Sequence, residues 1–158
     1  MIIDGKDKFG GYLEDFEIGQ VFTHWPGKTI TESDNNMFCL LTMNDNPIHT
    51  DRHYMKGHQY GKILVVGPLV ISLLVGMSVR DTSGKAVANL EYEKITHEKP
   101  VFEGDTIYGE SEILETRTTS RGDRGIVYTE SRAFNQNGDK VLTLRRRFLV
   151  PRREGRVN

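Results

Sequence analysis

The apolar residues of this chain follow two different spacings, and the change between them separates predicted helices from predicted strands. Met37, Leu40 and Leu41 lie three to four residues apart, which predicts an amphipathic helix. Thr31 or Ser33 can cap the start of that helix through a side-chain oxygen. The helix should end near residue 43, because a proline at position 47 disfavours helical geometry in the residue before it.

A second helix is predicted over residues 69–79, which are apolar around almost the whole circumference. That pattern predicts a helix buried on nearly every side. Gly67 fits the cap before this helix, and Pro68 fits its first position, where a missing N–H costs nothing. Residues 44–62, between the two helices, are polar and expected to be irregular, and long irregular segments are often functional.

Strands are predicted on both sides of the helical region. A short one spans residues 21–24, a break is predicted at Pro26 and Gly27, and extended structure resumes over residues 28–31. Four longer ones follow the apolar helix, over residues 87–96, 105–115, 125–134 and 140–150. Asn137-Gly138 predicts a hairpin turn between the last two. The fold class is therefore α+β, with one long buried helix wrapped by a curled antiparallel sheet.

The length of 158 residues fits one domain. We expect it to span residues 13–151, between a polar N-terminal arm (1–12) and a basic C-terminal tail (152–158). The net charge of -1 gives no bulk attraction to nucleic acid. No apolar run is long enough to span a membrane, and the first residues lack a signal-peptide pattern. The single cysteine, Cys39, is expected to be buried, and a reducing cytoplasm is the expected location.

The candidate chemistry lies in the run Asn44-Asp45-Asn46-Pro47-Ile48-His49 and at the start of the apolar helix. A histidine can both accept and donate a proton near neutral pH, so His49 is the first catalytic candidate. Gly67 is a candidate oxyanion donor, because a helix start offers free N–H groups and a partial positive charge. A base facing an oxyanion site suits chemistry beside a thioester carbonyl.

The neighbours of His49 leave several interpretations open. Asn44 can hold a water through its amide but cannot exchange a proton, and it can equally end a helix. Asp45 can take over acid–base work if it turns toward the site. Asn46 is a possible substrate contact, although an Asx turn that supports the loop is the stronger expectation. His49 itself can be a loop histidine satisfied by hydrogen bonds.

Three short motifs carry a resemblance to a known family. Residues 43–49 resemble Gly-Asp-x-Asn-Pro-[Leu/Ile/Val]-His, residues 65–69 resemble its apolar entry to a central helix, and residues 100–106 resemble Pro-Val-x-x-Gly-Asp-Thr. In this order they resemble the MaoC-like dehydratases, which include R-specific enoyl-CoA hydratases and have the hotdog fold. The catalytic aspartate of that family falls on Asn44 here. Leu41-Thr-Met-Asn44 with Pro47, His49 and Asp51 is similar to the mesaconyl-CoA hydratase branch.

The resemblance implies an acyl-CoA hydratase or dehydratase that interconverts a trans-2-enoyl-CoA and a 3-hydroxyacyl-CoA, with R stereochemistry. It implies catalytic roles at Asn44 or Asp45 with His49, and oxyanion or substrate contacts at Val66 and Gly67. It implies no cofactor beyond the coenzyme A of the substrate, and at least a homodimer. The alternatives are a non-catalytic acyl-CoA-binding hotdog protein and a hotdog thioesterase, although residues 69–79 lack the carboxylate expected of a thioesterase.

Two sets of basic residues are candidates for substrate anions, and no metal site is convincing. Arginines near the C-terminus are candidates for the phosphates of coenzyme A: Arg145, Arg146, Arg147, Arg152, Arg153 and Arg156. A distal carboxylate on the acyl group would need a further cation, and the candidates besides the arginines are His53, Lys56, His58 and Lys62. The alternative for both sets is a solvated surface.

Overall fold

The computed structural model describes residues 1–153, so Arg156 and the rest of the predicted tail from residue 154 lie outside the described residues. Short 3₁₀ turns occur at residues 5–8, 13–15 and 83–85. The longer elements are, in chain order, β1 (Val21–Thr29), α1 (Glu32–Thr42), α2 (Pro47–Thr50), α3 (Arg52–Met55), α4 (Gly67–Ser78), β2 (Ala88–His97), β3 (Thr106–Thr118), β4 (Arg124–Phe134) and β5 (Lys140–Pro151).

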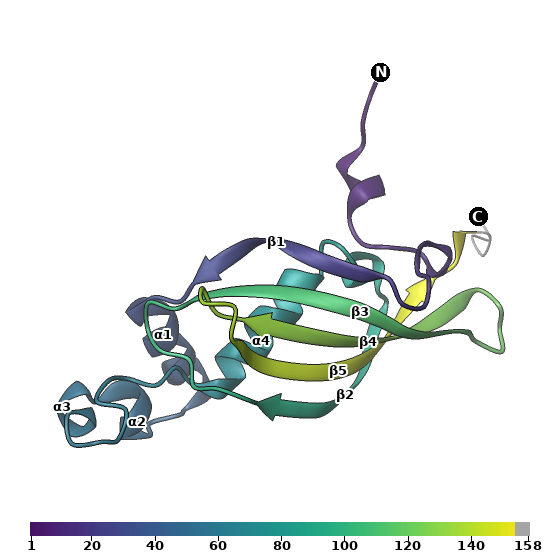
Figure 1. The fold of residues 1–158 in the computed structure, drawn as a ribbon. Coiled ribbons are helices and arrows are strands. Elements are labelled where there is room, and N and C mark those ends of the chain that lie inside the picture. The colour runs from purple at the N-terminus through teal and green to yellow at the C-terminus, as the bar shows by residue number, and fades with distance from the viewer. Residues whose placement is uncertain (154–158) are drawn as a thin grey trace.

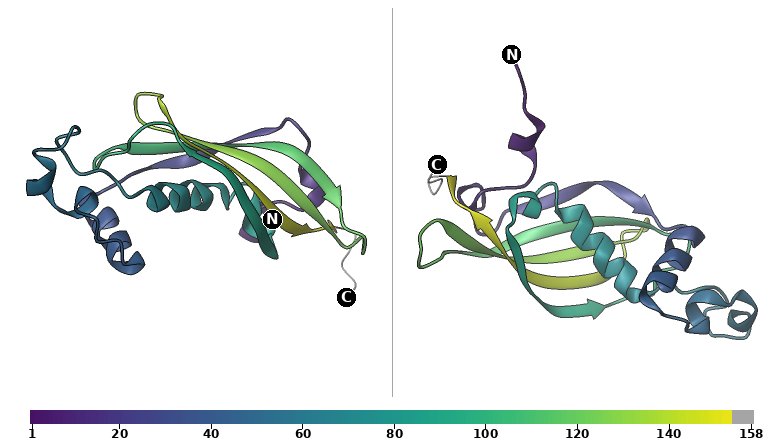
Figure 2. Two further views of the ribbon diagram at one scale, coloured as in Figure 1. Left: turned by 90° about the horizontal axis from the view of Figure 1, so that it is seen from below. Right: turned by 180° about the vertical axis from the view of Figure 1, so that it is seen from behind.

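The five strands form one antiparallel sheet in the order β1-β3-β4-β5-β2. The sheet curls, and α4 lies along its concave face (Figures 1 and 2). Helices α1, α2 and α3 gather beyond one end of the sheet, next to the start of α4 (Figure 1). The α+β prediction of one helix against a curled antiparallel sheet is confirmed.

The strand predictions after α4 are confirmed to within a few residues, and β1 is longer than predicted. Strand β1 is continuous from Val21 to Thr29, although its register with β3 is irregular between His24 and Lys28, where the break was predicted, and pairing resumes at Lys28. A proline has no N–H to give to a neighbouring strand, so sheets accept it at bulges of edge strands. Both conditions hold here, since β1 is the outermost strand on its side.

Helix α1 starts and ends as predicted but buries different residues. Thr31 accepts a hydrogen bond from the Asp34 N–H in a capping box, and Met43 closes the helix in a left-handed conformation. The buried residues are Asn35 and Cys39, and burial raises the pKa of the Cys39 thiol. The predicted apolar face is exposed instead, with Leu40 81% exposed. Because α1 lies beyond the end of the sheet, only a narrow strip of it reaches the core.

The segment after α1 is more regular than predicted. Residues 47–50 and 52–55 each form one helical turn, so His49 lies in a short helix. Asn46 caps the first turn by accepting from the Ile48 N–H at 3.1 Å, and Asp51 caps the second. Helix α1 ends where expected but is closed by Met43, and Pro47 starts α2, because its fixed φ suits the first turn of a helix.

Helix α4 buries one face and leaves the other partly uncovered. Val70, Leu74 and Ser78, four residues apart, are buried against the sheet. The opposite face is only half-buried, so the predicted burial on nearly every side is wrong for a single chain. The N-cap is Val66 and not Gly67, which is the first residue of the helix.

Two apolar clusters fill the space under the sheet. The larger one lies beneath α4 and includes Val70, Leu74 and Ile107. The second lies at the opposite end, where Phe16 contacts Phe148 edge to face at a centroid distance of 6.2 Å. The core therefore supports the whole length of the sheet and fixes α4 against it.

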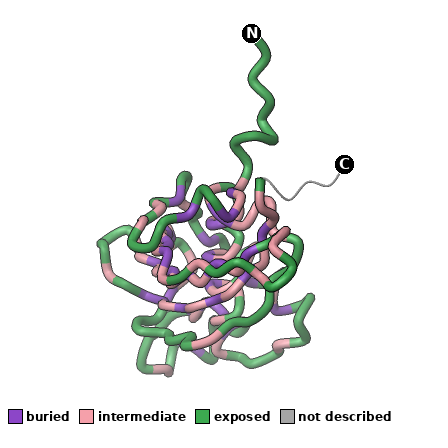
Figure 3. Tube along the Cα trace, turned by 90° about the vertical axis from the view of Figure 1, so that its right-hand side faces the viewer, coloured by how far each residue is buried: buried purple, intermediate pink, exposed green. Residues whose placement is uncertain are grey.

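The chain before residue 10 extends away from the sheet and is exposed (Figure 3). Lys85 anchors the part of this segment that lies nearest the sheet. The Lys85 ammonium group donates to the carbonyl oxygens of Lys6, Phe9 and Gly10. No helix among residues 1–153 combines the length and the apolar character needed to cross a bilayer.

Candidate active site

His49 lies in the one-turn helix α2 and is 8% exposed. Its Nδ1 atom is 2.7 Å from the carbonyl oxygen of Leu64. A carbonyl oxygen can only accept, so Nδ1 must carry the proton of this hydrogen bond. In the neutral ring the other nitrogen, Nε2, then has a free lone pair, which is the form that a general base needs.

The cavity beside His49 has a volume of about 400 Å³ and reaches the start of α4. Its wall is formed by residues from α2, the 60–67 segment, α4 and the turn after β2: His49, Tyr60, Leu64, Val65, Gly67, Val70, His97, Glu98, Lys99, Pro100 and Val101. The structure therefore brings together His49 and Gly67, the two residues on which the sequence argument depended most.

Asn35 connects the two halves of this site and was missed by the sequence analysis. Its buried amide donates to the His49 carbonyl oxygen at 2.9 Å and accepts from the Val66 N–H at 3.0 Å. A buried amide with both ends bonded fixes the distance between the elements that it joins. Asn35 therefore holds α2 against the start of α4, and no local signal distinguishes it from the polar residues around it in the first half of α1.

The start of α4 offers fewer donors than a typical helix start. The Val66 N–H is used by Asn35, Pro68 has no N–H, and the Leu69 N–H donates to the Val66 carbonyl at 3.0 Å. The Gly67 N–H has no partner among residues 1–153. Of the two predicted oxyanion contacts, Gly67 keeps a free donor and Val66 serves as a structural anchor.

Asn44 and Asp45 lie outside the His49 cavity. They line a neighbouring cavity of about 490 Å³ together with Cys39, Leu40 and Met43 of α1 and its C-cap. The Asn44 side-chain oxygen accepts from the Asn46 N–H at 3.2 Å, which is a turn-forming bond. The structure of the single chain thus separates the residue in the family's aspartate position from His49.

The remaining predicted residues have structural partners. Asn46 is exposed and caps α2, in line with the Asx turn expected from the sequence. Arg145 pairs with Glu130, Arg147 with Glu91 and Glu93. These pairs occupy the charges that were assigned to coenzyme A phosphates.

Arg146 differs from its neighbours because it is buried, with 3% exposure. It donates to the hydroxyls of Ser78 and Ser83 at 2.8 Å, and burial lowers the pKa of its guanidinium. Ser78 is the last residue of α4, where a helix has a partial negative charge. Arg146 thus stabilises the end of α4 and is closed to a phosphate.

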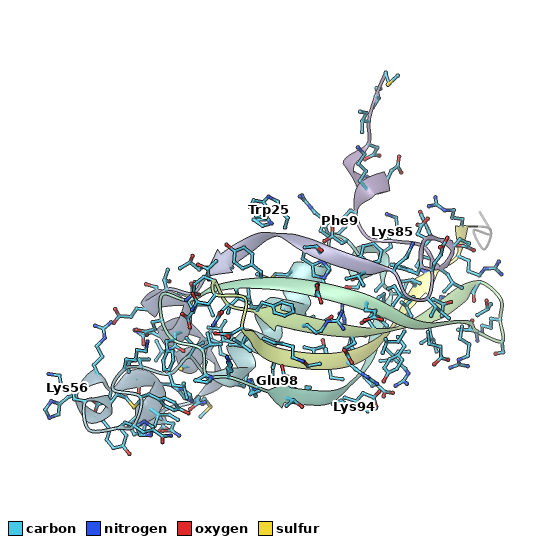
Figure 4. All side chains as sticks on the ribbon, in the orientation of Figure 1. Phe9, Trp25, Lys56, Lys85, Lys94 and Glu98 are labelled. Carbon is cyan, nitrogen blue, oxygen red and sulfur yellow. The ribbon has the colours of Figure 1, made fainter. Side chains whose placement is uncertain are left out.

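The other candidate cations also lie away from the His49 cavity. Arg152 and Arg153 pair with Glu14 and Asp15, and the Lys62 ammonium lies 4.1 Å from the centre of the Phe102 ring. None of the four distal-carboxylate candidates on residues 53–62 is among the residues that line the cavity. Lys56 lies at the outer end of the helical segment, far from the sheet (Figure 4).

His97 was absent from the sequence analysis, yet it lies against the start of α4. A β-carbon built on Gly67 would be 2.9 Å from both Cε1 and Nε2 of the His97 ring. The residue is the last of edge strand β2, and no local pattern distinguishes it from the other polar residues there. Only the approach of β2 to α4 reveals it.

Comparison with known proteins agrees with this architecture. The family described as MaoC like domain matches residues 15–133, so the chain belongs to that family. A mesaconyl-CoA hydratase from Cereibacter sphaeroides is 28% identical over 149 residues, which cover 94% of this chain and 43% of that protein. An (R)-specific enoyl-CoA hydratase from Aeromonas caviae is 29% identical over 106 residues, or 67% of this chain and 75% of that enzyme.

A solved structure identifies the fold. A conserved hypothetical protein from Mycobacterium tuberculosis, described as a double hotdog fold, superposes with a TM-score of 0.83 at 23% identity. The match covers 90% of this chain and 44% of that one. The chain therefore has the hotdog fold of MaoC-like hydratases and dehydratases, and it spans less than half the length of the mesaconyl-CoA hydratase that it matches.

Proposed function

We propose that this protein is an acyl-CoA hydratase or dehydratase that interconverts a trans-2-enoyl-CoA and an R-3-hydroxyacyl-CoA. One observation carries the proposal. The Leu64 carbonyl accepts from Nδ1 of His49, which leaves Nε2 unprotonated in the neutral ring, and His49 lines the same cavity as Gly67, whose N–H has no partner among residues 1–153. A base and an oxyanion donor that face one cavity are the two groups that this reaction needs.

The proposed reaction uses His49 twice. In hydration, Nε2 removes a proton from water while the water oxygen forms a bond to Cβ of the enoyl group. The π electrons of the Cα=Cβ bond move toward the thioester oxygen, where the Gly67 N–H and the positive end of α4 stabilise the charge. The resulting imidazolium then returns the proton to Cα, so one water is added in total.

Asn44 has a smaller part in this proposal than its counterpart in the family has. An amide does not exchange protons near neutral pH, and Asn44 lines a different cavity from His49. We therefore assign both proton transfers to His49. If Asp45 were the base instead, Asp45→Asn would lower activity as much as His49→Ala, whereas we expect Asp45→Asn to retain most activity.

The finer substrate assignment is mesaconyl-CoA and its hydrated product, β-methylmalyl-CoA. It rests on the similarity to the hydratase from Cereibacter sphaeroides and on the run Leu41-Thr-Met-Asn44. The cavity contains Lys99 as a possible partner for a distal carboxylate, but Lys99 already binds Asp139 at 2.6 Å. The turnover rate with mesaconyl-CoA, compared with the rate with a simple enoyl-CoA, therefore decides the substrate class.

We also propose a homodimer, formed over the uncovered face of α1 and α4. Met37 and Leu41 of α1, both exposed, line one surface pocket with the half-buried Leu69 and Leu73 of α4. Leu40 is also exposed on α1, so the helix presents a wide apolar surface. Exposed apolar patches of this kind mark interaction sites. A second copy would also supply the other half that the double hotdog relative has in one chain.

The test follows the loss of enoyl thioester absorbance with crotonyl-CoA and mesaconyl-CoA, for the wild type, His49→Ala and Asp45→Asn. Hydration by the wild type that falls by about 100-fold or more in His49→Ala supports the proposal. Faster turnover of mesaconyl-CoA supports the finer assignment. Release of free thiol would indicate a thioesterase, and tight binding without turnover would indicate a non-catalytic binder. Sedimentation of the wild type against Leu40→Glu tests the dimer.

A further inference from the structure

The free N–H of Gly67 is a single donor, whereas an oxyanion is best stabilised by more than one. Within residues 1–153 the neighbouring backbone gives no second donor, since Pro68 has no N–H and those of Val66 and Leu69 are bonded. A second donor at this position must therefore come from a side chain. This requirement follows from the sequence Val66-Gly67-Pro68 itself. Gly67 lets another group approach the helix start closely, and Pro68 removes the adjacent N–H.

His97 is the side chain in the right place. Its ring lies edge-on against Gly67, with Nε2 and Cε1 each 2.9 Å from the position of a β-carbon on that residue. Any larger residue at position 67 would collide with the ring. His97 also lines the same cavity as His49 and Gly67, so the cavity holds two imidazoles together with the Gly67 N–H.

The nitrogens of the His97 ring are also available for a hydrogen bond to a substrate. No hydrogen bond or ion pair joins either ring nitrogen to another described residue. Its charged neighbours in the turn are occupied elsewhere, because Glu98 pairs with Lys140 and Lys99 with Asp139. The ring is exposed in the single chain, and an acyl thioester in the cavity would cover it, which strengthens a hydrogen bond by excluding water.

We infer that His97 is the second oxyanion donor, which hydrogen-bonds through an imidazole N–H to the thioester oxygen that Gly67 also binds. The inference rests on the proposed function, since it places the thioester carbonyl at the start of α4. His97 then acts as a catalytic residue that stabilises charge but exchanges no proton. His49 keeps both proton transfers.

Three substitutions separate donation from ring packing and from proton exchange. His97→Phe keeps a ring against Gly67 and removes the N–H, so kcat/KM should fall by about 100-fold. His97→Gln restores an N–H donor that cannot exchange a proton and should recover most of that loss. Thr96→Ala is the matched control, because alternate strand residues point to opposite faces and Thr96 therefore faces away.

The decisive readout does not need turnover. Butyryl-CoA with a ¹³C-labelled thioester carbonyl cannot be hydrated, and hydrogen bonds to its oxygen lower the carbonyl stretching frequency. We expect the bound frequency to be lower than the free one in the wild type, in Thr96→Ala and in His97→Gln. It should return toward the free value in His97→Phe. Thermal melting of each variant checks that the fold is retained.

The outcomes distinguish this inference from the proposed function. An equal frequency in the wild type and His97→Phe, or no bound-state shift in the wild type, overturns the donor role. Activity in His97→Gln as low as in His97→Phe also overturns it, because it indicates proton exchange. If the shift depends on His97 but the wild type hydrates no enoyl-CoA, the donor role stands and the hydratase proposal fails.

Discussion

Two buried histidines lie near opposite ends of α4, and only one of them is left with a free nitrogen. His24, 2% exposed, binds Asp81 through Nδ1 at 2.7 Å and Ser111 through Nε2 at 2.8 Å. His49, 8% exposed, has one partner at Nδ1 and a cavity at its other side. The resemblance of the first cluster to a catalytic triad is misleading, because Ser111 is buried and bonded to Ser131.

The difference teaches that a partner on each nitrogen makes a histidine structural, whereas one partner and one open nitrogen make it reactive. The His24 cluster joins β1 and β3 to Asp81, three residues after the end of α4, so it ties the segment that follows the helix to the sheet. The His49 cluster uses a backbone carbonyl to fix the tautomer and leaves Nε2 to the cavity. The same kind of side chain is therefore fully bonded near one end of α4 and keeps an available nitrogen near the other, where we propose the chemistry.

The largest expected effect is a loss of activity when His49 is substituted. His49→Gln should lower kcat by about 1000-fold, because the amide has no basic lone pair on nitrogen, while the melting temperature stays near that of the wild type. Steady-state kinetics on crotonyl-CoA and a thermal melt measure both. A variant that melts far below the wild type would instead make His49 a structural residue like His24.

A substitution of His24, near the other end of α4, should have the opposite effect, lowering stability and leaving activity nearly unchanged. His24→Phe keeps a ring in the core but loses two hydrogen bonds, so the free energy of unfolding should fall by about 2 kcal/mol. Urea unfolding measures this loss, and kcat of the folded variant should stay within about threefold of the wild type. A loss of turnover without a loss of stability would place chemistry at the His24 cluster and remove the contrast.

Asn35→Asp tests whether the position of His49 depends on the hydrogen bonds of the Asn35 amide. The new carboxylate can accept from the Val66 N–H but cannot donate to the His49 carbonyl, and it lies close to Glu103. We expect kcat to fall by about 10-fold with a smaller change in KM, since the base moves and the substrate cavity remains. Asn137→Asp, in the distant β4–β5 turn, is the matched control. Equal kinetics in both variants would show that Asn35 positions nothing.

The smallest effect concerns acid stability of the helix that carries Asn35. The hydrogen bond from Lys28 and the N–H of Thr31 lower the pKa of Asp34 to about 2. The unfolded value is higher, so this stabilisation is complete above about pH 4 and is lost as the pH falls toward 2. Asp34→Asn should cost up to about 1 kcal/mol at pH 6 and clearly less at pH 2. Melting curves across that range would contradict this if the two proteins differed equally throughout.

Local spacing in the sequence was enough for most of the fold. The four strands after α4, the Asn137-Gly138 hairpin and the Thr31 capping box all depend on residues within a few positions of one another. His49 and Gly67 were identified by residue type on a turn and at a helix start. The strand, hairpin and capping predictions are confirmed because period, turn chemistry and capping are properties of short segments. The catalytic roles of His49 and Gly67 stay predictions, which the assays above test.

Burial was predicted less well, because it depends on what lies opposite each face. Leu40 and Leu41 have helical spacing, yet α1 lies beyond the sheet and leaves them exposed. The face of α4 that points away from the sheet is likewise only partly covered in the single chain. Periodicity reports which residues share a face and not whether a neighbour covers it.

The sequence by itself determined the strands and the central helix, and it singled out His49 and Gly67 as candidates for the chemistry. Only the tertiary structure decided the tautomer of His49, the brace through Asn35 and the contact between His97 and Gly67. It also separated Asn44 from His49, although both lie in one motif. The physical reason is that a site is made by contacts between segments distant in the chain, and those contacts follow from the packing of helices against the sheet.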